Sequence, residues 1–138
     1  MTKETKTMSG VILLTVPSIA YGGYFLLGVL SGQYAELELT SFQQAMFRAG
    51  HAHAGVLIIL SLLAQLFADH ASLSPRWKWT ARLSFPVSSL LISGGFFAAA
   101  GTPGSTSPNA LIAMLYFGIA VLVTGLVTLG IGLLRKQS

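Results

Sequence analysis

The sequence predicts an all-α integral membrane protein, a four-helix bundle in which each helix crosses the bilayer. Two observations support this fold class. Only 9% of the 138 residues are charged and 53% are hydrophobic, whereas a soluble domain carries about 25% charged residues. Four separate apolar segments also reach the length of about 20 residues that a helix needs to cross a hydrocarbon core about 30 Å thick. We therefore expect residues 1–138 to form a single transmembrane domain.

The predicted spans cover about residues 8–32, 45–68, 80–100 and 109–134. An alternative for the first segment is a signal peptide, because Lys3 and Lys6 precede an apolar run. That run stays apolar as far as Leu30, which is too long for an ordinary signal-peptide core. The uncharged stretch Gly101–Pro108 predicts a tight turn, with the fourth helix starting at Ser107-Pro108-Asn109.

Two prolines, Pro17 and Pro86, fall inside the first and third spans. Each removes a backbone hydrogen-bond donor and should bend its helix. Membrane helices tolerate such a proline when a neighbouring group satisfies the freed carbonyl.

The basic residues lie almost entirely on one side of the predicted membrane. Only Arg48 falls on the other side, in a stretch that also carries Glu36 and Glu38. By the positive-inside bias, both termini and the second-to-third loop are predicted to be cytoplasmic, in a multi-pass protein of the cell inner membrane. The net charge of +4 does not indicate nucleic-acid binding, because the basic residues flank apolar spans. The seven on the predicted inner side are Lys3, Lys6, Arg76, Lys78, Arg82, Arg135 and Lys136.

Small residues are frequent in the first, third and fourth spans. They allow the close helix approach that membrane packing requires, either within the chain or between subunits. Four helices enclose little interior of their own, so we expect a homo-oligomer. The absence of cysteine excludes disulfides, Cys-ligated zinc and iron–sulfur clusters.

The chemistry-bearing segment is Arg48-Ala49-Gly50-His51-Ala52-His53-Ala54-Gly55, at the predicted outer end of the second helix. At 100° per residue, the two histidines point about 200° apart and cannot chelate one ion from a regular helix. His51 shares a partly polar side with Arg48, whereas His53 lies on an apolar side with Val56 and Leu60. A single imidazole among apolar residues is typical of an axial haem ligand. The alternative for His53 is a core histidine that is hydrogen-bonded to a carbonyl or to Tyr21, Tyr24 or Tyr116.

His70 lies at the C-terminal end of the same helix. A cation is favoured there by the helix dipole, so His70 fits a structural role.

The layout of the chain is similar to that of the styrene oxide isomerases. The shared features are a Gly-rich first helix, a polar outer loop, a histidine motif opening the second helix and a Pro/Gly-rich turn before the fourth. The resemblance covers most of the chain in layout and short stretches in residues. The matching residues are Ala52-His53-Ala54-Gly55, Gly95-Phe96-Phe97, Gly101–Pro108 and Phe117-Gly118.

The resemblance implies a homotrimer with haem b at each subunit interface, held by His53 as the metal ligand. It also implies a small apolar epoxide substrate, which ferric iron polarises as a Lewis acid so that an aldehyde forms without net redox change. Arg48 would pair with a haem propionate, and His51 would contact a propionate, a neighbouring subunit or the outer loop.

Two positions depart from the family pattern. Phe97 stands where the family has a tyrosine that helps to hold the epoxide, and Ile59 stands where it has an asparagine. Both changes remove polar groups that would orient an epoxide. Two alternatives to an isomerase therefore remain open. One is a non-catalytic haem protein that senses, carries or stores its ligand, and the other is a cofactor-free accessory membrane subunit.

Overall fold

The computed structural model describes residues 1–34 and 36–135, so Lys136, one of the predicted cytoplasmic cations, lies outside the described residues. It contains the helices α1 (Lys3–Leu30), α2 (Ser41–His70), α3 (Pro75–Ala99) and α4 (Ile112–Leu134). All four are long and apolar enough to cross a membrane, and the described part of the chain has no strand. The predicted all-α four-helix bundle is therefore confirmed.

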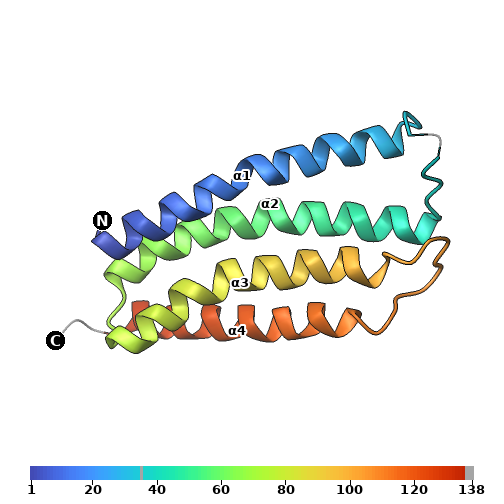
Figure 1. Ribbon diagram of the computed structural model, residues 1–138. Helices are drawn as coiled ribbons and strands as arrows, with labels where there is room; N and C mark the ends of the chain where they lie inside the picture. Colours follow the sequence, from blue (N-terminus) through green and yellow to red (C-terminus); the bar gives the residue numbers. More distant parts are fainter. Residues whose placement is uncertain (35, 136–138) are drawn as a thin grey trace.

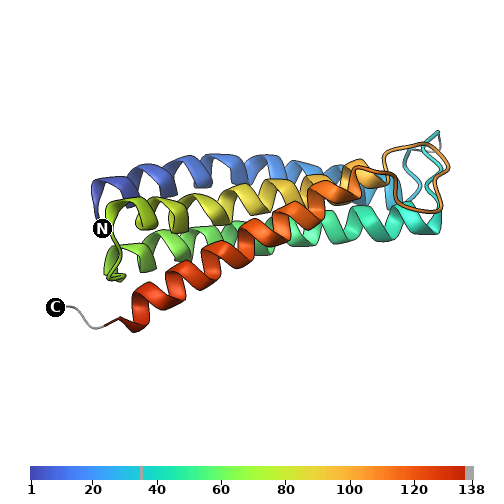
Figure 2. The same cartoon turned by 90° about the horizontal axis from the view of Figure 1, so that it is seen from below.

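The helices run up and down, so that the start of α1 and the end of α4 lie at the same end of the bundle (Figure 1). We call this end the basic end, because it carries Lys3, Lys6, Arg76, Lys78 and Arg135. The opposite end holds the α1–α2 and α3–α4 loops. In the perpendicular view, α4 crosses the other helices obliquely (Figure 2).

Three helices begin earlier than the apolar pattern predicts. Proline at the first position opens α3, and polar residues cap α1 and α2. In α1, the Thr2 hydroxyl accepts a hydrogen bond from Thr5 N at 3.2 Å. In α2, Thr40 and Gln43 form a capping box, in which each side chain bonds the other residue's backbone N–H. The Thr40-x-x-Gln43 spacing is a recognisable helix-start signal in the sequence.

The fourth helix begins later than predicted, at Ile112. Asn109 instead opens the turn before it, where its Oδ1 accepts from Leu111 N at 2.8 Å and its carbonyl accepts from Ile112 N at 3.1 Å. The same loop is tied to the start of α2, because the Thr40 hydroxyl donates to Ser105 O at 2.6 Å. The two loops therefore close this end of the bundle together.

The core lies around α3, which packs between α2 and α4, while α1 packs mainly against α2. Glycines set the close approach of α3 and α4. A methyl group at Gly95 would lie 2.7 Å from Leu115 N, and one at Gly125 would lie 2.6 Å from Ser84 Cβ. Packing within the chain, one of the two expected uses of small residues, thus accounts for these glycines.

Pro86 has the neighbouring partner that its position requires. A proline cannot donate to the carbonyl four residues earlier, which here belongs to Arg82. Gln65 Nε2, on α2, donates to Arg82 O at 2.9 Å. A buried side chain of one helix therefore satisfies the carbonyl that proline frees in the next.

Candidate functional site

His53 lies near the middle of α2, not at its outer end as the sequence predicted. Because α2 runs unbroken from Ser41 to His70, His53 is about 4 Å from the midpoint of the helix axis at 1.5 Å per residue. The capping box at Thr40 adds a turn of helix before the predicted span, so that residues 41–52 precede His53 in α2. A helix of this length that crosses a bilayer carries its central residues through the hydrocarbon core.

The orientation of the His53 ring follows from one hydrogen bond. His53 Nδ1 lies 2.7 Å from Ala49 O. A carbonyl oxygen only accepts, so Nδ1 donates the hydrogen in this bond and Nε2 is the ring nitrogen without a partner in the described part of the chain. The ring also lies beside Phe96 on α3, with 5.0 Å between the centroids. This arrangement fixes the ring and leaves Nε2 available to an external group.

The His53 side chain is exposed on the outside of the chain. The alternative of a buried core histidine is therefore wrong, because the side chain is exposed. The hydrogen bond to a carbonyl, which that alternative also predicted, is present. An ionisable side chain that faces lipid near the middle of a membrane is costly and marks a functional position by default.

His51 belongs to a different surface. It is half-buried and faces α1, where a methyl group at Gly23 would lie 2.8 Å from His51 Nε2. The regular helix thus keeps the two imidazoles on separate sides, and they do not converge on one ion. The contact with Gly23 gives His51 a packing partner within the chain, which the sequence pattern did not indicate.

Arg48 is exposed and lies about 7.5 Å from His53 along the helix axis, toward the α1–α2 and α3–α4 loops. A surface ion pair with Glu36 or Glu38 is the other role that the sequence offers Arg48. Among residues 1–34 and 36–135 the ion pair found joins Arg82 to Asp69, and Arg48 forms none there. The Arg48 guanidinium is therefore open to an anionic group from outside the chain.

Phe97 and Ile59, the two positions that depart from the isomerase pattern, both have apolar side chains. The Phe97 ring packs against Phe47, with 5.4 Å between the centroids, and touches α2 at Gly50. Ile59 is 61% exposed on the outside of α2. Phe96, for which the sequence analysis predicted no separate role, lies beside the His53 ring.

A second polar cluster lies at the basic end, and the sequence did not predict it. Arg82, expected among the interfacial cations, is instead only 4% exposed and pairs with Asp69 at 2.6 Å. The same Arg82 nitrogen donates to the Thr5 hydroxyl at 2.8 Å. The cluster lies about 24 Å from His53 along α2, so it serves packing and not the His53 site.

Among the described residues, no group of three or more His, Cys, Asp or Glu side chains could hold a metal ion. A haem differs from such a site because it needs only one protein ligand. No family model, curated protein or solved structure matches this chain.

Proposed function

We propose that this protein binds haem b in the membrane through His53 Nε2. The observation that carries the proposal is an exposed imidazole near the middle of a membrane helix, whose Nδ1 is bonded to Ala49 O. Metal-ligating histidines usually donate their other ring N–H to a carbonyl or carboxylate in this way. A flat, largely apolar cofactor suits the hydrocarbon surroundings and the adjacent Phe96 ring.

The proposal includes a homo-oligomer, and we propose a trimer from the resemblance stated above. His53 faces outward, so one chain covers only one side of a haem. A second copy would supply the remaining wall and shield the imidazole from lipid. Arg48, exposed nearer the outer loops, would pair with a propionate through a charge-assisted hydrogen bond.

We further propose that the bound group supports isomerisation of an apolar epoxide to an aldehyde, since ferric haem supplies a Lewis acid for an epoxide oxygen. The part of this chain is to hold the haem at His53 and to keep water out with Phe96 and Phe97. A non-catalytic haem protein is the second candidate. It is favoured by the side chains of Phe97 and Ile59, which offer no hydrogen-bond donor to a substrate.

The visible spectrum of the purified protein, after reconstitution with haem, tests the proposal. We expect a Soret band in the parent protein and its loss in His53→Ala, because a single axial ligand has no substitute. His70→Ala is the matched control, since it removes an exposed histidine from the same helix about 26 Å away. A parent protein without a Soret band would leave the cofactor-free accessory subunit as the remaining function.

Two further variants test the assigned roles. Arg48→Ala should weaken haem retention without abolishing the band, and losses of about 10- to 100-fold are usual for groups that support a metal ligand. His51→Ala, which removes the contact with α1, should shift or weaken the spectrum less than His53→Ala does. If His51→Ala loses haem and His53→Ala keeps it, the ligand assignment is wrong. Aldehyde formation from an aryl epoxide then separates the isomerase from the non-catalytic protein.

A further inference from the structure

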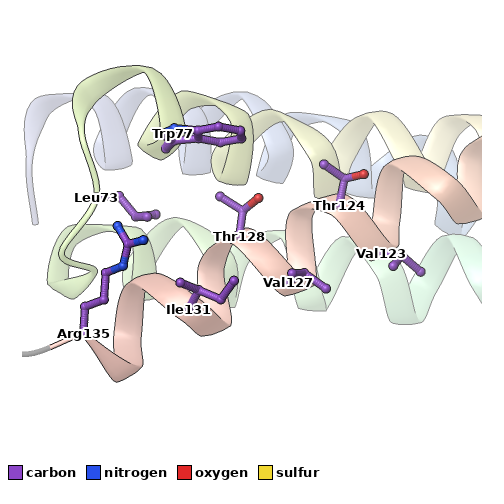
Figure 3. A pocket seen from close by; sticks show the side chains of 8 residues that line it. All are labelled: Leu73, Trp77, Val123, Thr124, Val127, Thr128, Ile131 and Arg135. Carbon is purple, nitrogen blue, oxygen red and sulfur yellow. The ribbon is translucent and has the colours of Figure 1, made fainter.

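A second surface feature lies at the basic end, away from His53. It is an apolar groove of about 540 Å³ between the second half of α4 and the start of α3 (Figure 3). At this end α4 crosses the other helices obliquely (Figure 2), while Gly132 O of α4 accepts from Ser72 N in the α2–α3 turn at 2.7 Å. Its apolar lining comes from Leu73, Val123, Val127 and Ile131, with the Trp77 ring on one wall and Arg135 at its end.

The length of the groove matches one leaflet of a bilayer. Val123 and Arg135 are about 18 Å apart along α4 at 1.5 Å per residue. Half of a hydrocarbon core about 30 Å thick is about 15 Å. Trp77, near the start of α3, lies where tryptophan is enriched, at the boundary between hydrocarbon and headgroups. A lipid acyl chain along α4 would therefore place its headgroup beside Trp77 and Arg135.

The charge at this end of the groove is positive. Arg135 directly follows α4 and is exposed, and its side chain points toward Leu73 across the groove (Figure 3). Arg76 and Lys78 flank Trp77 in the sequence. Asp69, the acidic residue at this end of α2, is paired with Arg82 and so does not neutralise Arg135. A guanidinium binds phosphate through well-directed hydrogen bonds, and basic pockets between membrane helices bind anionic headgroups.

The groove wall is mostly hydrocarbon and also includes Thr124 and Thr128. The Thr124 hydroxyl donates to Ala120 O at 2.9 Å, so its hydrogen-bonding need is met within α4. The groove volume falls within the range of about 300–1,000 Å³ that ligand sites occupy. From the length, the charge and the lining, we propose that this groove binds one acyl chain of an anionic phospholipid, with the lipid phosphate at Arg135.

The test uses the full chain in nanodiscs that contain phosphatidylglycerol and phosphatidylcholine in equal amounts, followed by native mass spectrometry of the released protein. We expect phosphatidylglycerol to be retained in preference to phosphatidylcholine. Arg135→Gln should weaken this retention about fivefold, which corresponds to about 1 kcal/mol for one basic residue at an anionic surface. Arg76→Gln is the matched control, because it removes the same charge at the same end outside the groove lining.

Val127→Trp fills the middle of the groove and should reduce the retention of both lipids. Equal loss in Arg76→Gln and Arg135→Gln would overturn the proposal in favour of diffuse surface attraction. Equal retention of the two lipids in the parent would refute the role of the phosphate. Self-crosslinking of Val127→Cys, a unique cysteine in this chain, would instead identify a second copy as the occupant. The visible spectrum of Arg135→Gln distinguishes this proposal from haem binding. If the variant loses the lipid and keeps the Soret band of the parent, the groove and the haem site are independent.

Discussion

Replacing Asp69 by alanine should detach the N-terminal end of α1 from the bundle. The Asp69 carboxylate accepts hydrogen bonds from Thr2 N at 3.0 Å, the Thr2 hydroxyl at 2.8 Å and the Thr5 hydroxyl at 2.6 Å. It also accepts from Arg82 Nη2 at 2.6 Å. One side chain of α2 thus joins the start of α1 to α3.

The size of the effect follows from burial. The side chains of Arg82 and Asp69 are 5% and 10% exposed, so water replaces little of the lost interaction. Removing one partner of such a pair leaves an uncompensated buried charge and costs about 3–5 kcal/mol, whereas replacing both partners by apolar groups is often close to neutral. The variant Asp69→Ala should therefore unfold at a lower temperature than Asp69→Ala/Arg82→Met.

Two measurements check this expectation in detergent. Thermal unfolding followed by circular dichroism gives the order of stability of the parent, the single variant and the double variant. Limited trypsin digestion reports on α1, because cleavage after Lys3 and Lys6 should accelerate in Asp69→Ala once α1 is released. If the double variant is as unstable as the single variant, the loss does not come from an unpaired Arg82 and the reasoning fails.

Three other predictions concern the membrane topology, the assembly and the α2–α3 contact. Single cysteines introduced at Ser74 and Ser105 lie in loops at opposite ends of the bundle. They should react with a membrane-impermeant reagent from opposite sides of the membrane, with the Ser74 position on the cytoplasmic side. Equal labelling of both from outside would contradict four spans. Native mass spectrometry in mild detergent should show an oligomer, and a trimer if the proposed haem site is shared; a protein that remains monomeric would argue against it. Gly50→Ala should destabilise the fold by about 1–3 kcal/mol, because the added methyl group would lie 3.0 Å from the Phe97 ring. Gly55→Ala meets nothing within 4 Å and is its control, so equal effects of the two substitutions would refute a packing cause.

The number and type of the helices follow from the sequence because the membrane imposes a simple rule. Each span needs an unbroken apolar length, and charges gather at the span ends. Helix ends are less predictable from hydropathy, since polar residues continue a helix beyond the hydrocarbon. The Thr40-x-x-Gln43 capping-box pattern is visible in the sequence and predicts the start of α2 correctly.

The contacts between helices could not be predicted in the same way. The burial of Arg82 depends on the register that brings α2 and α3 together, which leaves no trace in local hydropathy. The same is true of the Phe96 ring beside His53 and of Gly23 beside His51. Helix periodicity did predict that the two histidines face different sides, because that angle depends on one helix alone.

The bond between Gln65 and Arg82 O has a consequence for how the chain enters the membrane. Of the four helices, α3 is the least hydrophobic, and it contains both Arg82 and Pro86. Alone in lipid, it would expose a charge and a carbonyl without a hydrogen-bond partner, and each of these is costly. Helix α2 supplies Asp69 as the ion-pair partner of Arg82 and Gln65 as the donor to the carbonyl. We therefore expect α2 and α3 to leave the translocon as a paired hairpin, with α3 depending on the helix made before it.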